Sequence, residues 1–194
     1  MAQAAEDVRA RLARAAGALE NAGVPYTIAG DNAVASWVGR KNRAAVRLTQ
    51  NVDLIIRRVD FDAAAAALAS AGFIHRRAAG VESFLDGPAA KARDALYILF
   101  AGERVRPNYE FPAAEVSESE RTEEFRVLTL EALVRMKLTS YRRKDQVHLL
   151  DMMGVDLIDE SWCRKLPPLL ADRLKLLIDT RDDEPDLELL DPPT

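Results

Sequence analysis

The sequence has few of the residues that form crosslinks and metal clusters. Of its 194 residues, one is cysteine (Cys163) and two are histidines, His75 and His148. A single cysteine excludes an internal disulfide and a cysteine-ligated metal cluster. The two histidines are far apart in the sequence, so a histidine-rich metal site is not expected either.

Long apolar segments are also missing. No apolar run approaches the ~20 residues that span a bilayer. The first ten residues contain charges and no apolar core of the kind that signal peptides have. We therefore expect no membrane association through a spanning helix, and a cytoplasmic location is the default.

Excess charge of one sign is confined to one end. The chain has 27 basic and 31 acidic residues and a formal net charge of −4. Residues 181–194 alone carry six acidic side chains and one basic side chain, so residues 1–180 are close to neutral. A chain without basic excess is not expected to be a general nucleic-acid coat protein. We expect one folded domain over 1–180, followed by an acidic, mobile tail over 181–194.

Hydrophobic spacing and turn residues predict a mixture of helices and strands. Apolar residues three and four positions apart predict helices over residues 4–22, 32–38, 61–71, 130–141, 143–153 and 166–178. Short apolar runs predict strands over 26–29, 52–56, 73–77, 81–85, 95–101 and 126–128. Residues 107–124 are expected to form a loop. This order predicts an α/β (α+β) domain with a mixed sheet, flanking helices and a C-terminal helical layer.

Polar residues cluster at the end of the first predicted strand and at the beginning of the second. Gly30 ends the first strand and opens a helix, and Arg47, Thr49, Asn51 and Asp53 alternate as the second strand begins. Alternation along a strand would put these four side chains on one face. A helix N-terminus opposite them would offer free N–H groups to phosphate, and carboxylates at such spacing can hold Mg²⁺. The pattern predicts a pocket for phosphate and metal.

These segments resemble the nucleotidyltransferase fold (DNA polymerase β-like), in particular its small bacterial members. Their pattern is hydrophobic-Gly-Gly-x-Ala-Val followed by Arg-x-Thr-x-Asp-hydrophobic-Asp, and this chain has IAGDNAV at 28–34 and RLTQNVD at 47–53. Lys137 and the run Arg-Arg-Lys-Asp at 142–145 resemble the Lys…Arg-x-Lys-Asp segment of abortive-infection toxins. The resemblance covers about residues 24–153, and 154–180 would add C-terminal helices.

For an active member, the resemblance implies nucleotidyl transfer from a nucleoside triphosphate to RNA, protein or a small molecule. Two Mg²⁺ or Mn²⁺ ions would align the reacting oxygens. The metal ligands implied are Asp53, Asn51 and Asp94, and Lys137 would join Asp53 and Asn51 in catalysis. Nucleotide-binding residues implied by the resemblance are Gly30, Asp31, Arg47, Thr49, Arg143 and Lys144. RNA or an antitoxin-like protein would be a partner.

The chain departs from this pattern at three positions. Asn51 stands where the first metal carboxylate is expected, and Asp31 stands where a small residue is usual. The nearest alignment puts Tyr97 at the third carboxylate, with Asp94 three residues earlier, and strand alternation allows at most one of them to serve. The alternative function is therefore an inactive member of the fold that binds nucleotide, RNA or a protein partner.

Each candidate residue also has a structural explanation. Asp31 could cap the helix N-terminus, and Asn51 could satisfy the Thr49 turn at the strand entry. Arg47 could pair with Asp53, since a buried carboxylate needs a partner.

The basic segment 135–144 could form a solvated face in which Lys137 has no partner. His148 is expected to pack against Asp145 rather than take part in catalysis.

Overall fold

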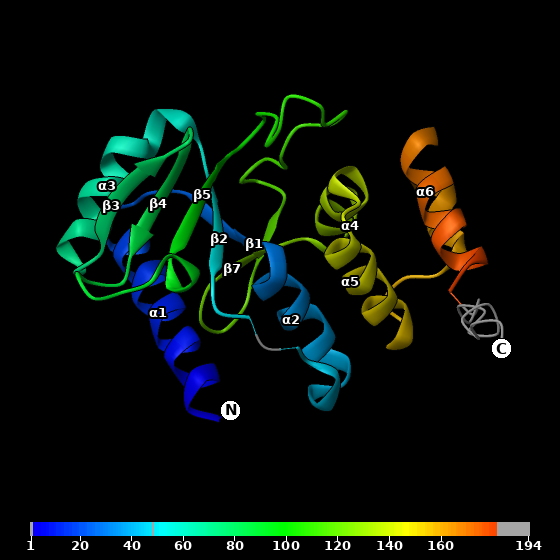
Figure 1. Cartoon of the computed structure of the whole chain (residues 1–194), viewed down its shortest axis with the longest axis horizontal. Helices are drawn as coiled ribbons and strands as arrows, with labels where there is room; N and C mark the ends of the chain where they lie inside the picture. Colours follow the sequence, from blue (N-terminus) through cyan, green and yellow to red (C-terminus); the bar gives the residue numbers. More distant parts are fainter. Residues whose placement is uncertain (1, 48, 182–194) are drawn as a thin grey trace, which may run out of the picture.

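The computed structural model describes residues 2–47 and 49–181 (Figure 1). In this part of the chain, α-helices and strands alternate up to residue 78, further strands follow up to residue 128, and the last segment is helical. The helices are α1 (Ala2–Asn21), α2 (Gly30–Lys41), α3 (Phe61–Ser70), α4 (Leu130–Ser140), α5 (Arg143–Gly154) and α6 (Pro168–Asp179). The strands are β1 (Tyr26–Ala29), β2 (Val52–Ile56), β3 (Ile74–Ala78), β4 (Val81–Leu85), β5 (Leu96–Phe100), β6 (Ser119–Arg121) and β7 (Arg126–Leu128). No helix in this part of the chain is both long enough and apolar enough to cross a membrane. The predicted tail beyond residue 181 lies outside the described residues.

The described strands form one mixed sheet in the order β3-β4-β5-β2-β1-β7-β6. The pairs β2–β5 and β1–β7 are parallel, and the other neighbouring pairs are antiparallel. In this register Asp53 of β2 lies between Ala29, the last residue of β1, and Tyr97 of β5. The sheet therefore brings the end of β1 next to the beginnings of β2 and β5, and the predicted fold class is confirmed.

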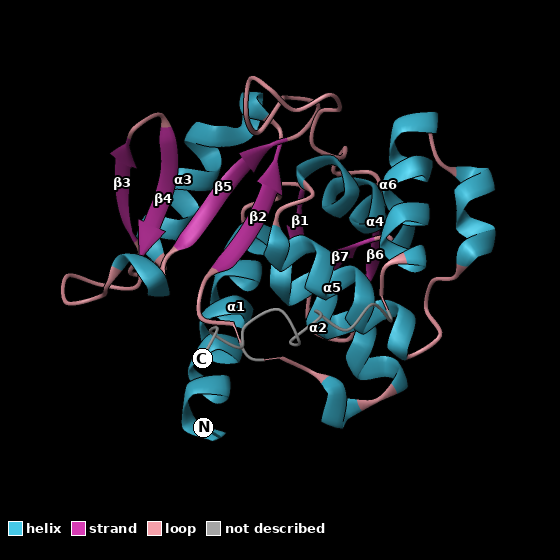
Figure 2. Ribbon diagram, turned by 45° about the vertical axis from the view of Figure 1, so that its right-hand side comes forward, coloured by secondary structure: helices cyan, strands magenta, loops and turns pink. Residues whose placement is uncertain are grey.

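Helices cover both faces of the sheet, and α6 lies outermost on one side (Figures 1 and 2). On one face, α1 and α3 bury Leu12 and Leu68 against Leu54 of β2. On the other face, α2, α4 and α5 bury a second apolar cluster that includes Val34 and Ile55. Helix α6 joins this second cluster and contacts α4. Two cores thus hold the sheet from both sides.

Strand alternation fixes which polar side chains face the second set of helices. In β2, Leu54 and Ile56 belong to the cluster under α1 and α3, whereas Ile55 belongs to the cluster under α2 and α4. Because successive side chains point to opposite faces, Asp53 shares the face of Ile55. Tyr97, opposite Asp53 in β5, shares it too.

Three features differ from the sequence-based prediction. Strand β2 has the predicted bounds, but Arg47, Thr49 and Asn51 lie before it rather than at alternating strand positions. Helix α2 begins at Gly30 and continues past Gly39 to Lys41, because Gly39 does not adopt the left-handed conformation that would end a helix. Strand β6 (Ser119–Arg121) was not predicted, since its three polar residues carry no apolar pattern.

Candidate functional site

Gly30 forms the junction between β1 and α2, and no larger residue fits there. Its φ of 60° lies in the left-handed region that favours glycine. A Cβ added to Gly30 would lie 1.9 Å from Oδ2 of Asp53. The carboxylate of Asp53 therefore rests directly against the backbone at the start of α2.

Asp53 is partly buried between this backbone and α4, and its surroundings favour the protonated form. Burial raises the pKa of the Asp53 carboxyl, and the negative charge of Asp31 raises it further. The positive charges of Lys137, Lys144 and Arg142 oppose this shift in pKa but do not cancel it. Asp53 is thus a carboxyl group with weakened acidity at the edge of a cavity.

A chain of hydrogen bonds joins Asp53 to the connection before β2. Nδ2 of Asn51 donates to Oδ1 of Asp53 at 3.4 Å. The Thr49 hydroxyl lies 3.3 Å from Oδ1 of Asn51 and 3.2 Å from Oδ2 of Asp31. The carbonyl of Asn51 accepts a hydrogen bond from Asn32 at 2.8 Å. Thr49, Asn51 and Asp53 therefore lie together through hydrogen bonds, and not through alternation along a strand.

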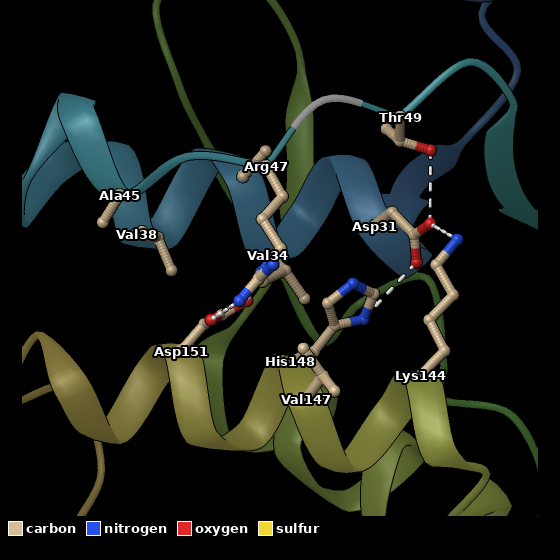
Figure 3. Close-up of a pocket in the computed structure, with 11 residues that line it drawn as sticks. Asp31, Val34, Val38, Ala45, Arg47, Thr49, Lys144, Val147, His148 and Asp151 are labelled. Carbon is tan, nitrogen blue, oxygen red and sulfur yellow. Dashed lines mark hydrogen bonds and ion pairs between the residues drawn. The ribbon is translucent and has the colours of Figure 1, made fainter.

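Arg47 lies away from Asp53, at a smaller pocket of about 170 Å³ between α2 and α5 (Figure 3). Its guanidinium donates two hydrogen bonds to Asp151, at 2.6 and 3.0 Å, and its side chain is 63% exposed. The predicted Arg47–Asp53 pair is therefore wrong. The reason is that Arg47 lies before β2 rather than on its face, and its guanidinium reaches Asp151 of α5.

Asp31 lies in the first turn of α2 and points toward α5 (Figure 3). The cap position is Ala29, and no side chain caps this helix, so the predicted capping role of Asp31 is wrong. The carboxylate instead contacts Lys144, Lys137 at 3.4 Å and Nδ1 of His148 at 3.5 Å. Burial acts to raise the pKa of Asp31, but Lys144 and the positive charge of Lys137 lower it overall. Asp31 is held as an anion.

Lys137 on α4 is 5% exposed, so the expectation of a solvated lysine is wrong. Its ammonium lies 3.1 Å from Oδ1 of Asp145, 2.9 Å from Nδ1 of His148 and 3.4 Å from Oδ1 of Asp31. A charged side chain can be buried to this extent only if hydrogen-bonding or oppositely charged groups surround it. The sequence could not show these partners, because they come from two other helices, α2 and α5.

His148 on α5 contacts Lys137 and Asp31, whereas the sequence analysis expected it against Asp145. Burial lowers the pKa of His148, and the positive charge of Lys137 lowers it further. The imidazole is therefore neutral at pH 7, and Lys137 donates to its Nδ1, which assigns the ring proton to Nε2.

Asp145 lies on the other side of this cluster, in the first turn of α5. It accepts hydrogen bonds from Arg142 at 2.8 Å and Ser140 at 2.7 Å, and it forms a capping box with the main chain of Arg142. Burial acts to raise the pKa of Asp145, but these donors and Lys137 lower it to about 2. The carboxylate is fully ionised and fully paired.

The third predicted carboxylate is not in the cavity that Asp53 faces. Asp94 ends a short 3₁₀ turn (Ala92–Asp94) before β5 and is not among the residues that line this cavity. Tyr97 lines it, next to Asp53, and its hydroxyl donates to the carbonyl of Ala92 at 2.9 Å. Of the two candidates, the tyrosine therefore stands beside Asp53.

The two basic residues at the start of α5 differ in their surroundings. Lys144 contacts Asp31 and lines the smaller pocket. Arg143 is exposed at the first helical position and lines neither this pocket nor the cavity at Asp53. Only Lys144 of the pair is therefore brought to the predicted site.

A cavity of about 390 Å³ lies between β2, β5, α4 and the segment 105–113. Its polar lining includes Asp53, Asp31, Lys137, Arg142, Asp145 and Arg106. Its aromatic lining consists of Tyr97, Tyr109 and Phe111. Arg106, Tyr109 and Phe111 were not predicted from the sequence, because they come from a loop without hydrophobic periodicity. Aromatic residues within an otherwise polar loop were the one available signal. The volume is within the ~300–1,000 Å³ range of small-molecule sites.

The residues at this cavity do not fit a pair of metal ions. Two-metal sites use carboxylates that bridge both ions, and Asn51 turns its amide nitrogen toward Asp53. Asp31 and Asp145 are already paired with basic side chains. Across residues 2–47 and 49–181, no three His, Cys, Asp or Glu side chains form a group that could hold a metal. A single Mg²⁺ at Asp53 and Asn51 stays a prediction.

Comparison with solved structures finds proteins of one fold. An antigenic nucleotidyltransferase-like protein from Paracoccidioides brasiliensis matches 91% of this chain and 89% of its own, with TM-score 0.56 and 16% identity. ANT(2″)-Ia in complex with adenylyl-2″-tobramycin matches 94% of this chain and 100% of its own, with TM-score 0.53 and 14% identity. The solution structure of the antibiotic-resistance factor ANT(2″)-Ia matches 87% of this chain and 89% of its own, with TM-score 0.51 and 14% identity.

Comparison of the sequence with family models and with curated proteins finds no match. Membership of a particular group, such as the abortive-infection toxins, stays a prediction from the sequence. The mixed sheet, the Gly30–Asp53 junction and the similarity to solved structures agree on one conclusion. The chain has the nucleotidyltransferase fold.

Proposed function

We propose that this protein binds a nucleotide in the cavity beside Asp53 and does not transfer nucleotidyl groups through two metal ions. The observation that carries this proposal is the composition of the cavity. It combines aromatic and basic side chains with Asp53, a carboxyl group that forms no ion pair with any of the residues that the structure describes.

The lining suits the parts of a nucleotide. Tyr97, Tyr109 and Phe111 offer aromatic faces, on which bases of any identity stack. Arg106 and Arg142 are exposed basic side chains that can contact a phosphate group. ANT(2″)-Ia, a neighbour in fold, was solved with adenylyl-2″-tobramycin, so a ligand with a nucleotide part has a precedent in this fold.

We propose the absence of nucleotidyl transfer through two metal ions because of the ligands that the cavity could offer to a metal. The Asn51 amide carries no charge and is tied into the Thr49–Asp53 hydrogen-bond chain. The raised pKa of Asp53 further weakens it as a metal ligand, because a cation must displace the proton. RNA and an antitoxin-like protein remain alternative partners, predicted from the sequence resemblance alone.

Calorimetry tests the binding proposal. Four nucleosides and their 5′-monophosphates are titrated into the full chain in the presence of EDTA, and at least one is expected to bind. Tyr109→Leu removes an aromatic face and is expected to weaken that binding by about 1 kcal/mol, roughly fivefold in Kd. The matched control is Phe125→Leu, since Phe125 is a partly buried aromatic residue outside the cavity.

The binding proposal fails if none of these compounds binds, or if Phe125→Leu weakens binding as much as Tyr109→Leu does. A second assay incubates the chain with radiolabelled nucleoside triphosphates, Mn²⁺ and total RNA or protein. We expect no label to be transferred. Transfer that disappears in Asp53→Asn would show a working enzyme and would contradict the second half of the proposal.

A further inference from the structure

We propose that the Asp31 carboxylate takes the place of a phosphate group, so that the cavity accepts a nucleoside or a nucleoside monophosphate in preference to a triphosphate. This inference rests on the proposed nucleotide binding and names its ligand class. It makes Asp31 the residue that sets specificity.

The donors around Asp31 are those that would bind a phosphate. Lys144 and the Thr49 hydroxyl contact Oδ2, the latter at 3.2 Å, and Lys137 lies 3.4 Å from Oδ1 (Figure 3 shows the first two contacts). Two ammonium groups and a hydroxyl directed at one anion form a charge-assisted site. The anion in that site belongs to the protein itself.

Lys137 has no capacity left for an incoming phosphate. An ammonium group has three donors. Those of Lys137 face Asp31, Asp145 and the lone pair of His148. A phosphate group could reach this nitrogen only by displacing one of these partners. Because the Lys137 side chain is 6% exposed, water could not replace the lost contact.

The charge balance of the cavity leaves room for one anionic group. Its charged lining comprises three carboxylates (Asp31, Asp53 and Asp145) and three basic side chains (Arg106, Lys137 and Arg142). Lys137 and Arg142 pair with two of these carboxylates, Asp31 and Asp145. Arg106 forms no ion pair with any residue that the structure describes, and it can neutralise a single phosphate. The further charges of a triphosphate would lie near the Asp31 anion, and the basic side chains that line the cavity are otherwise paired.

The experiment measures binding of inorganic tripolyphosphate, which has no base, to the full chain in EDTA. The native chain is expected to bind it weakly or not at all, and Asp31→Asn is expected to bind it roughly tenfold more tightly. Adding Lys144→Ala to Asp31→Asn should abolish the gain. The control is Asp151→Asn, which removes a carboxylate from α5 at the same smaller pocket and changes net charge equally.

Two results would overturn the inference. In the first, native protein and Asp31→Asn bind tripolyphosphate equally. In the second, Asp151→Asn gains as much affinity, which would show a general effect of charge. Because the probe has no base, this outcome is independent of nucleoside binding. A gain in Asp31→Asn alongside a native chain that binds no nucleoside would leave Asp31 as an anion mimic while refuting the proposed function.

Loss of Asp31 could also impair folding, so refolding is measured as well. If Asp31→Asn does not fold, Asp31→Ser, a smaller neutral replacement, is refolded with and without tripolyphosphate, and sodium chloride at matched ionic strength is the comparison. Recovery of the folded state with tripolyphosphate alone supports the inference. Equal recovery in both salts, or no recovery in either, overturns it.

Discussion

Gly30 and Asp53 depend on each other at the level of single atoms. The absence of a Cβ at position 30 lets the Asp53 carboxylate lie against the start of α2, where a side chain would meet it at 1.9 Å. The same close approach buries Asp53 and raises its pKa. One glycine therefore controls both the local backbone and the chemistry of the carboxyl group.

Replacing this glycine should be costly. Gly30→Ala is expected to lower the free energy of unfolding by about 2 kcal/mol or more, because a left-handed φ is strained in alanine and Asp53 must move. Chemical denaturation measures the change. The control is Gly17→Ala in α1, where nothing lies within 4 Å, and it should stabilise by up to ~1 kcal/mol. Equal effects of the two substitutions would refute the close contact.

Lys137 is the residue on which the buried ion cluster depends. Lys137→Met would leave Asp31 and Asp145 without their shared partner and should destabilise the protein by about 3–5 kcal/mol. Lys175→Met is the matched control, since the Lys175 side chain is 57% exposed and its ion pairs should contribute under ~1 kcal/mol. Urea denaturation of both variants measures the change in the free energy of unfolding. A small decrease for Lys137→Met would contradict a buried ion cluster.

At the scale of helices and strands, the sequence predicts the features that depend on residues close together in the chain. Apolar periodicity located the principal helices and the buried strands, because their packing faces repeat at fixed intervals. It could not locate the partners of Lys137, which come from α2 and α5, or place Arg47 beside Asp151. Those contacts depend on how helices meet across the fold. Tyr109 was not predicted either, because the loop that contains it has no hydrophobic periodicity.

Helix α5 should lose stability in acid through its first turn. The pKa of Asp145 is about 2 in the folded protein and 3.8 in its ordinary state, so its ionised form stabilises the fold above about pH 4. That contribution, about 2 kcal/mol, is lost as the pH falls from about 4 to 2. Denaturation at several pH values should give Asp145→Asn a flatter profile over this interval. An unchanged slope would count against the predicted pKa.

Helix α6 is expected to be an integral layer of the domain. Leu174 is fully buried in the cluster shared with α4, and Leu174→Ala should destabilise by about 2–5 kcal/mol. Leu176 on the same helix is 55% exposed, and Leu176→Ala should cost less than ~1 kcal/mol. Thermal unfolding of both variants tests this. Similar small losses would indicate that α6 packs only loosely.

At the scale of the whole molecule, the fold and the site give different information. The sheet with helices on both faces is the fold of nucleotidyltransferases, but function is carried by the site. Gly30, Asp53 and Lys137 lie together at the candidate site. The buried Lys137 is paired within the protein, with Asp31 and Asp145. This internal pairing is the basis of our proposal that the ligand carries little charge.

The most direct measurement is a titration of the full chain with Mn²⁺. Binding is monitored through the electron paramagnetic resonance signal of the free ion. The account predicts that the native chain binds fewer than two ions. It also predicts that Asn51→Asp, which restores a second carboxylate beside Asp53, binds Mn²⁺ more tightly. Two ions bound by the native chain, and both lost in Asp53→Asn, would contradict the account.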